Sequence, residues 1–493
     1  MAQSRKDEAS ARRRITERCL IAADVDKTIL EQATPTERQK FLRRVAPKLL
    51  ESAELGMKLA FVTGNSMSQL AERFLKWLIE QLCHSDGLEL LEQFHFFCNS
   101  GGVYFHFPSS DPDIAALLEE HKSDHSGLAG HVFKLLTMRR SDGVFIKPRF
   151  VDRAYLTRTQ IPHSEALEIK EILEQCGEDY YKSLVRRRKA LGRSYNLDLV
   201  SEGGRLQKPF VDMRPVEHGP VADPLRATVQ LTLKPILSFR HAYDEHQEKL
   251  FEADQRTKVL KAIQHRLDES GLAHYAARPG GRSSIDVTFE KLDKAYAMEF
   301  LIDSLNVEGS ARQGQRLGAN SVYFGDEVIV GGGNDYPVTR IPGLLVFAVN
   351  ADKKLIPFLS HVFVPSSILE GPEATAEVLG QLNSIARSAL HTGGPSACLV
   401  YGCTRHCTAI DCFKVEVFGQ RIQEKIQTLK NTEKLNPDEW QVLHALVTLM
   451  HRDDPAARRW LAILVDELDA IMTQITENPR AIQQGIGTSH PDN

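Results

Sequence analysis

Short apolar runs alternate with amphipathic segments along the first hundred residues. Three of these runs contain few polar side chains and lie at 19–23, 58–62 and 94–98. Runs of this kind are typical of strands buried on both faces of a sheet. The segment after the first run places Phe41, Val45 and Leu49 on one face of a helix, with Pro35 suited to its start and Gly56 to its end. Alternating strands and helices predict a parallel sheet covered on both faces.

The pattern changes near Pro108 and changes back near Arg282. Between these points, charged segments surround strand-like stretches such as "GVFIKPRF" and "ATVQLTLKPIL", which indicates an inserted α+β region. After it, "RSSIDVTFE", "SVYFGDE" and "LLVFAVN" read as strands of the resumed α/β pattern. We therefore expect an α/β fold with a Rossmann-like parallel sheet core. Its parts are an N-terminal arm at 1–16, the core at 17–107 and 281–364, the inserted α+β domain at 108–280, and a helix-rich C-terminal extension at 365–493.

Composition and charge argue against a nucleic-acid-binding, membrane-spanning or secreted protein, but they do not indicate a particular function. The 493 residues suffice for two to four domains, and the formal net charge of -4 gives no global basic field for nucleic acid or a membrane. No apolar run approaches the roughly 20 residues of a membrane span. The polar N-terminus "MAQSRKDEASARRRITER" lacks the apolar stretch of a secretion signal. Together with only eight cysteines, these features favour a soluble protein of the reducing cytoplasm.

Half of the cysteines lie in the C-terminal extension, in "CLVYGCTRHCTAIDC" between 398 and 412. Their spacing differs from the C-x-x-C knuckle of structural zinc sites, so we interpret them as buried or incidental thiols, with a zinc site and a redox pair as alternatives. Amphipathic segments follow, and they favour packing against the core or against a second subunit. A homo-oligomer could therefore form through these C-terminal helices.

Four polar clusters each follow a predicted apolar strand. They are Asp24-Val25-Asp26-Lys27-Thr28, Thr63-Gly64-Asn65, Lys294, and Gly325-Asp326 with Gly333-Asn334-Asp335. Because ligands of open parallel sheets bind beyond the carboxyl ends of the strands, we expect the clusters to meet at one sheet edge. Two alternatives stay open from the residues alone: Lys291 competes with Lys294, and Thr63 could merely cap the following helix.

Two aspartates one residue apart at the end of a buried strand require an explanation, because like charges this close repel and are costly to desolvate. A cation among the carboxylates would remove the repulsion, and Mg²⁺ prefers oxygen ligands and often shares its site with a substrate phosphate. A carboxylate can also attack phosphorus and form an aspartyl-phosphate. Asp24 is then the nucleophile, and Asp26, on the same side of the strand end, is its general acid and base. A lysine and a threonine hydroxyl would bind the remaining phosphate oxygens.

In order and spacing, "DVDKT", "TGN", Lys294 and "GDEVIVGGGND" resemble the four motifs of the haloacid dehalogenase superfamily of phosphohydrolases and phosphomutases. The long insertion before the third motif resembles the subclass with a large α/β cap. That subclass includes Cof-type sugar phosphatases, sucrose-phosphate phosphatase and eukaryotic-type phosphomannomutase. "FCNSGGVYF" is similar to the segment by which the subclass leaves the core for the cap, and "EKLDKAYAM" is most similar to the phosphomannomutase version. The resemblance covers roughly residues 17–360.

The resemblance implies a role for each matching position. Asp24 is the nucleophile, Asp26 the general acid and base, Thr63 a ligand of the phosphoryl group, and Lys294 the cation that neutralises it. The implied ligands of Mg²⁺ are the carboxylates of Asp24, Asp326 and Asp335, the backbone carbonyl of Asp26, and Asn334 as a helper. The resemblance also implies that Thr28, Gly64 and Asn65 bind the substrate.

Several positions leave the assignment open. Lys27 stands where many members of the superfamily have glycine, so it either adds charge near the phosphate or points to solvent. The loop between Asp326 and Asp335 is long, and either Asn334 or Asp335 could lie nearest the metal. In the cap, Arg205 and Arg214 are candidate substrate clamps, because arginine pairs bidentately with phosphate or sugar acids, or else are ordinary surface arginines.

The sequence thus predicts a Mg²⁺-dependent phosphohydrolase acting on a small phosphorylated metabolite, a sugar phosphate. One alternative is a phosphomannomutase-like phosphosugar mutase, which would need the same two aspartates. The other is a non-catalytic regulatory or scaffold protein on the same fold.

Overall fold

The structure is a computed structural model of the chain. It describes residues 19–31, 39–120, 128–140, 143–191, 209–215, 228–234, 255–280, 284–305, 320–329, 333–349, 362–363, 369–391 and 413. The N-terminal arm, Arg205, the cysteines between 398 and 412 and most of the C-terminal extension lie outside the described residues. The predictions made for them, including an oligomer through the C-terminal helices, stay predictions.

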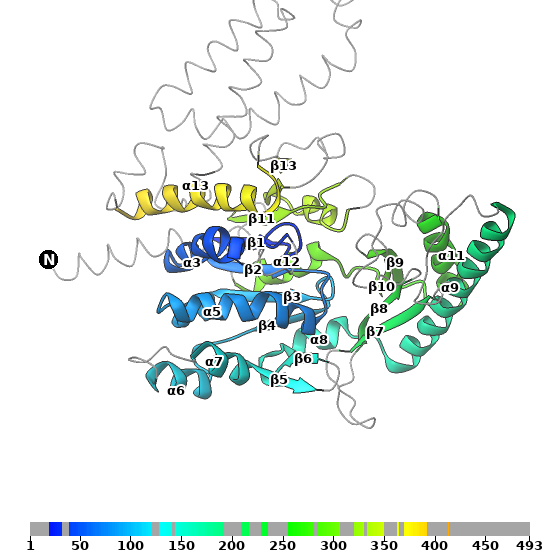
Figure 1. The fold of residues 1–493 in the computed structure, drawn as a ribbon, viewed down its shortest axis with the longest axis horizontal. Helices are drawn as coiled ribbons and strands as arrows, with labels where there is room; N and C mark the ends of the chain where they lie inside the picture. The colour runs from blue at the N-terminus through cyan, green and yellow to red at the C-terminus, as the bar shows by residue number, and fades with distance from the viewer. Residues whose placement is uncertain are drawn as a thin grey trace, which may run out of the picture.

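A seven-stranded sheet forms the centre of the molecule (Figure 1). Its strands, in spatial order, are β13 (Val362–Phe363), β12 (Leu345–Ala348), β11 (Ser321–Gly325), β1 (Leu20–Ala23), β2 (Lys58–Val62), β3 (Phe94–Cys98) and β4 (Val103–His106). Every neighbouring pair is parallel except β3 with β4, which form an antiparallel hairpin. The predicted parallel core is confirmed, and its central strand β1 carries the first polar cluster at its carboxyl end.

Side chains of the sheet alternate between two apolar cores. On β1, Ile21 and Ala23 face one core, while Leu20 and Ala22 face the other. The first core is covered by α3 (Ala46–Glu54), α5 (Lys76–His84) and α13 (Gly371–His391), joined by η1 (Phe41–Val45), α4 (Met67–Leu70), η2 (Ala71–Leu75) and η3 (Leu88–Gln93). The second is covered by α12 (Lys294–Ser304) and η6 (Tyr336–Arg340). The strands are therefore buried on both faces, as their continuous apolar runs predict.

The chain after β4 stays with the core for some distance. It forms α6 (Pro112–Glu120), α7 (Leu128–Leu136), β5 (Thr137–Arg140), β6 (Gly143–Ile146), η4 (Pro148–Phe150) and α8 (Arg153–Thr159). Apolar side chains of α7 and β6 belong to the same cluster as the sheet, and α7 contacts α5 (Figure 1). This segment covers the edge of the sheet next to β4.

A second, antiparallel sheet lies to one side of the core (Figure 1). Its order is β7 (Phe210–Pro215), β8 (Thr228–Lys234), β10 (Ser284–Phe289) and β9 (Tyr275–Gly280). The helices α9 (His163–Leu191) and α11 (Gln255–Glu269) cover one face of it and enclose a separate apolar cluster.

The assignment of "RSSIDVTFE" to the core, within 281–364, is wrong. This stretch forms β10, which pairs antiparallel with β8 and β9. Its apolar Ile285 and Val287 alternate with Ser284, Asp286 and Thr288, a pattern of half-buried antiparallel strands rather than of strands buried on both faces. We propose that the inserted domain extends to about residue 290.

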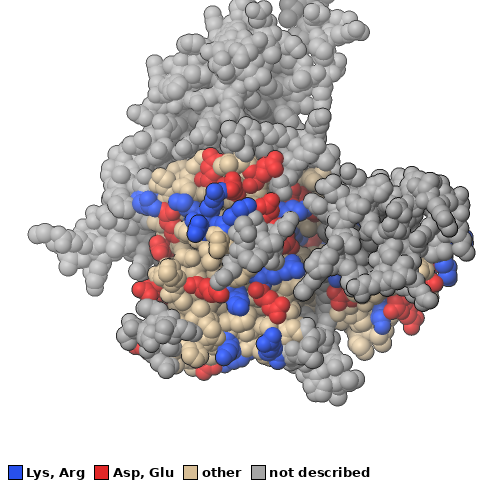
Figure 2. Space-filling model, in the orientation of Figure 1, with Lys and Arg blue, Asp and Glu red and all other residues tan. Residues whose placement is uncertain are grey.

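The C-terminal extension begins as part of the core. Helix α13 packs on α3 and η1, and Phe413 is buried against Phe347, with ring centroids 5.9 Å apart. No helix among the described residues is long and apolar enough to cross a membrane. On the visible described surface, Lys and Arg are interspersed with Asp and Glu, so neither sign of charge dominates this face (Figure 2).

Candidate active site

The loop after β1 is a tight turn that leaves Asp24 inside and Asp26 outside. The backbone N–H of Asp24 donates to Phe324 O at 2.9 Å and so continues the sheet, and its side chain is buried. Beyond it, the N–H groups of Ile29 and Leu30 both donate to Val25 O, at 3.0 and 2.9 Å. Asp26 is exposed at the sheet edge, where a group that exchanges protons with substrate and water needs to lie.

Three carboxylates from two loops, the one after β1 and the one after β11, lie close together. Asp24, Asp326 and Asp335 each offer an oxygen within 4.8 Å of the other two, and all three residues are buried. Asp335 can approach β11 only because residue 325 is glycine: a Cβ there would lie 2.6 Å from the Asp335 carboxyl carbon. The predicted meeting of the first and fourth clusters at one sheet edge is thus present in the structure.

Lys294 provides a cation to this cluster. Its Nζ lies 2.7 Å from Asp335 Oδ1 and 3.1 Å from Asp24 Oδ1, and its side chain is 1% exposed. It stands at the first position of α12, where Asp293 caps the helix by accepting a hydrogen bond from the Tyr296 N–H. Lys291, by contrast, is exposed. Of the two lysines left open by the sequence, Lys294 is the one that contacts the carboxylates.

Burial and mutual repulsion control the protonation of the cluster. Burial raises the pKa of Asp24 well above its usual value; Lys294 lowers it, and Asp335, Asp326 and Asp26 raise it. Burial, with Asp335 and Glu327, raises the pKa of Asp326 to about 7. Burial lowers the pKa of Lys294, but the carboxylates of Asp24 and Asp335 outweigh it and the pKa is raised, so the lysine stays charged. Three carboxyl groups thus share one buried ammonium, and the repulsion among them opposes their simultaneous ionisation.

Asp335 is the most fully bonded of the three carboxylates. Its Oδ1 accepts from Lys294 and, at 2.6 Å, from the hydroxyl of Tyr323, while its Oδ2 accepts from the Glu327 N–H at 2.9 Å. Asp24 Oδ1 accepts no hydrogen bond within the described residues despite the nearby ammonium, and neither does the buried Oδ1 of Asn334. Asp24 and Asp326 therefore have more oxygen atoms available for a cation than Asp335, which also contacts Lys294.

These residues fit a hard divalent cation. Buried carboxylate oxygens in excess of the positive charge, together with the unsatisfied amide oxygen of Asn334, form the oxygen-only donor set that Mg²⁺ prefers. Lys27 adds a second ammonium at the rim, since its Nζ lies 3.8 Å from Asp326 Oδ2 and its side chain is 31% exposed. Lys27 is therefore not directed only to solvent, and a role beside a bound phosphate stays a prediction.

The second cluster lies on the neighbouring strand. Thr63 follows β2, is 1% exposed, and accepts the Asn65 N–H on its Oγ1 at 3.1 Å. Ser66 caps α4 and forms a capping box with Gln69, so Thr63 is not the helix cap. Thr28 is fully buried with its hydroxyl lacking a partner among the described residues, Asn65 is buried, and Gly64 is half-buried.

The turn in "FCNSGGVYF", expected only as the exit from the core to the cap, also contacts the second cluster. Asn99, Ser100 and Gly101, between β3 and β4, all have positive φ values of 51°, 56° and 93°. The N–H groups of Asn99 and Ser100 donate to Asn65 O and Thr63 O, at 2.8 and 2.9 Å. The buried Oδ1 of Asn99 accepts no hydrogen bond from the described residues, which makes it a candidate substrate contact. The sequence feature that could have predicted this turn is "NSGG", because Asn and Gly tolerate a left-handed backbone.

The same turn contacts the chain leading to the second sheet. The hydroxyls of Tyr155 and Thr159 on α8 donate to Gly101 O and Gly102 O, at 2.5 and 2.7 Å. Arg214 lies on β7 of that sheet, but its side chain is outside the described residues, as is all of Arg205. Their proposed clamp role stays a prediction.

No protein-family model and no curated protein matches the chain. Among solved structures it is similar to an N-terminally truncated IMP-nucleotidase of Plasmodium falciparum, with 14% identity and a TM-score of 0.38 over 68% of this chain and 66% of that one. It is also similar to the sucrose-phosphatase of Synechocystis sp. PCC6803 in complex with sucrose and phosphate, with 13% identity and a TM-score of 0.36 over 74% and 97%. A third is SMU.1108c of Streptococcus mutans UA159, with 14% identity and a TM-score of 0.34 over 74% and 98%.

The chain itself supports the assignment of its fold. The central strand β1 and its neighbours β2 and β11 bring the Asp24 loop, Thr63, and Asp326 with Asp335 to one sheet edge, and Lys294 joins them from α12. An antiparallel domain is inserted between the second and third of these clusters. The chain therefore has an α/β fold in which a parallel core carries the four clusters and an antiparallel domain is inserted between the second and third of them, the arrangement expected from the resemblance of its motifs.

Proposed function

We propose that the protein is a Mg²⁺-dependent phosphatase that hydrolyses small phosphate monoesters through an aspartyl-phosphate. The observation that carries the proposal is the buried cluster of Asp24, Asp326 and Asp335 around the ammonium of Lys294. Such a cluster is costly to bury unless it binds a cation and an anion together. Two of the three solved structures named above are an IMP-nucleotidase and a sucrose-phosphatase, so nucleoside and sugar monophosphates are the first substrates to test.

Each residue has one task in the proposed reaction. A carboxylate oxygen of Asp24 attacks phosphorus, the bond from phosphorus to the ester oxygen breaks, and Asp26 gives its proton to the leaving oxygen. Asp26 then takes a proton from water, which attacks the aspartyl-phosphate and restores the Asp24 carboxylate. Thr63 and Lys294 hold the phosphoryl oxygens. When bound, Mg²⁺ neutralises charge on the phosphoryl group.

Asp24, Asp326 and Asp335 would hold the ion, with the carbonyl of Asp26 and the amide of Asn334 as further oxygen ligands. The raised pKa of Asp24 and Asp326 in the metal-free chain supports this assignment, because an added divalent charge would return both to the ionised form.

A sugar phosphate is the substrate that the cap supports best. On the sheet face opposite α9 and α11, Gln230 donates to Thr232 at 3.0 Å and Thr232 donates to Asp286 at 2.7 Å, while Gln230 Oε1 has no partner among the described residues. Figure 1 shows α9 and α11 on the side of this sheet away from the core, so the polar face is turned toward it. A row of buried polar groups suits a substrate rich in hydroxyls.

A panel of phosphorylated metabolites tests the proposal. Purified protein with Mg²⁺ should release phosphate from at least one sugar or nucleoside monophosphate, and Asp24→Asn should abolish the release. Isomer formation is followed in the same reactions, because isomerisation of a hexose phosphate without phosphate release would support the phosphomutase instead. If neither reaction occurs over the whole panel while the folded protein binds a partner, the scaffold alternative replaces the enzyme.

A further inference from the structure

Helix α13 of the C-terminal extension touches the loop that carries the proposed nucleophile. The Thr375 hydroxyl donates to the backbone carbonyl of Thr28 at 2.8 Å, and both residues are fully buried. Gly371, at the helix start, has a φ of 55° and lies so close that a Cβ would be 2.8 Å from Lys27 O. The two contacts fix the peptide units of Lys27 and Thr28 against the start of α13.

The contacted peptides belong to the strained part of the loop. Lys27 adopts a left-handed backbone with φ of 57°, which costs a residue with a side chain roughly 1 kcal/mol and needs support from its surroundings. This conformation separates the exposed Asp26 from the buried Thr28 and directs Lys27 toward Asp326. A shift of the loop would therefore displace the proposed general acid.

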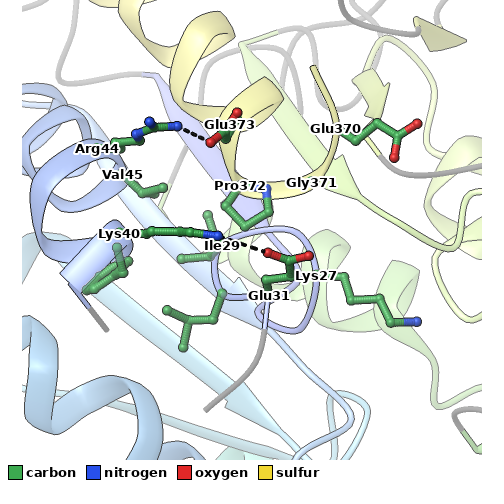
Figure 3. Close-up of a pocket in the computed structure, with 12 residues that line it drawn as sticks. Lys27, Ile29, Glu31, Lys40, Arg44, Val45, Glu370, Gly371, Pro372 and Glu373 are labelled. Atoms are coloured by element: carbon green, nitrogen blue, oxygen red, sulfur yellow. Dashed lines mark hydrogen bonds and ion pairs between the residues drawn. The ribbon is translucent and has the colours of Figure 1, made fainter. Parts of the chain in front are cut away.

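Ion pairs lie next to the contact between α13 and the Asp24–Leu30 loop. A pocket of about 300 Å³ lies between this loop, η1 and the start of α13 (Figure 3). Across it, Lys40 pairs with Glu31 at 3.7 Å, and Arg44 pairs with Glu373 of α13. Figure 3 shows the ammonium of Lys27 extending away from these pairs. Both pairs are solvent-accessible and weak, so the buried Thr375 contact carries more of the support.

We propose that α13 is a positioning element of the active site, and that Thr375 is the residue through which it fixes the Asp24–Leu30 loop. The proposal rests on the proposed phosphatase function for its kinetic consequence, but the positioning itself can be measured without turnover. Through this contact, the start of the C-terminal extension helps to place Asp26.

A second buried contact on the same helix provides a control. Asn383 donates to Lys48 O at 2.9 Å and accepts from the Ser52 hydroxyl at 2.7 Å, both on α3. It lies eight residues beyond Thr375, about 12 Å along the helix axis. Its loss should weaken the docking of α13 without removing a contact to the loop.

The experiment compares Thr375→Val, Thr375→Ser and Asn383→Ala in the full-length protein. With glycerol 2-phosphate, an alkyl phosphate whose leaving oxygen needs a proton, and Mg²⁺, we expect Thr375→Val to lower kcat about tenfold with KM within about twofold, because the fault is in placing catalytic groups rather than in binding. Thr375→Ser, which keeps the hydroxyl, should stay within about twofold of wild type. Asn383→Ala should lower the melting temperature and leave kcat within about twofold.

Hydrogen exchange separates this proposal from the phosphatase proposal. In metal-free protein, the amides of residues 27–30 should exchange about tenfold faster in Thr375→Val and at the wild-type rate in Thr375→Ser. If wild type hydrolyses no ester, the proposed function fails and the exchange result still decides the positioning. If Thr375→Val shows the hydrogen-exchange rates and the kcat of wild type, the positioning proposal is overturned. Should that variant not fold, Gly371→Ala must show both changes, and its failure to do so overturns the proposal equally.

Discussion

Replacing Lys294 by methionine tests the electrostatic account of the site most directly. The change keeps an unbranched side chain but removes the ammonium that lies 2.7 Å from Asp335 and 3.1 Å from Asp24. Asp24, Asp326 and Asp335 then remain within 4.8 Å of one another without that partner. Removing one member of a buried ion pair costs about 3–5 kcal/mol, so we expect Lys294→Met to lose about that much stability at pH 8 without metal.

The sign of the pH dependence follows from the raised pKa values. Asp24 and Asp326, the latter with a pKa of about 7, bind protons more tightly in the folded chain than in the unfolded one. Repulsion between the ionised carboxylates therefore destabilises the folded state at high pH. This destabilisation is relieved as the pH falls below the pKa values that the two groups have in the folded chain. Removing Lys294 raises both pKa values further. At pH 5 the carboxylates are protonated and most of the repulsion is gone, so the stability that Lys294→Met loses relative to wild type should shrink to below about 2 kcal/mol.

Urea denaturation followed by circular dichroism at pH 8 and pH 5, with EDTA present, measures the loss. Lys291→Met, at the exposed neighbouring lysine, is the matched control and should stay within about 0.5 kcal/mol of wild type at both pH values. A loss for Lys294→Met that is equal at the two pH values, or larger at pH 5, would refute the reasoning.

Three further outcomes are expected. Millimolar Mg²⁺ should raise the melting temperature of wild type, and Asp326→Asn should remove that rise, because the ion binds the folded chain only through the cluster; a scan with and without Mg²⁺ decides this. Asp26→Asn should lower kcat about 100-fold or more on an alkyl phosphate but much less on p-nitrophenyl phosphate, whose leaving group needs no proton; equal losses would argue against a general acid. Burial lowers the pKa of His95 to about 3. Wild type should therefore lose about 2 kcal/mol of stability from this group between pH 7 and pH 5, where the unfolded chain alone takes up the proton, and His95→Gln should flatten that slope in urea titrations.

Features that depend on local pattern could be predicted from the sequence. The apolar runs gave the strands β1, β2, β3, β11 and β12 because a strand buried on both faces leaves a continuous apolar signature. The polar residues that follow the strands identified the carboxylates, since parallel strands end at one edge. The strand β10 was assigned to the core sheet because it was recognised as a strand, but the alternation of its apolar and polar residues was not used to decide which kind of sheet it joins.

Contacts between distant segments could not be predicted in this way. The hydroxyl of Tyr323 on Asp335, the Asn99 turn against Thr63, and Thr375 on Thr28 each join side chains or backbone groups whose partner is not implied by either local sequence. Thr375 lies 347 positions from Thr28. Lys27 is a similar case, because its direction is set by a backbone conformation that no lysine prefers.

The pairing of β1 also constrains how the chain is made. Leu20 has Lys58 as one sheet partner and Ser321 as the other, 301 positions later. During synthesis the central strand must wait, with one row of its amides and carbonyls unsatisfied, until the ribosome has extended the chain past β11. Newly exposed strand edges of this kind recruit other chains, so nascent protein should depend on chaperones until late in translation. A chain stopped before residue 321 should aggregate rather than persist as a smaller soluble domain.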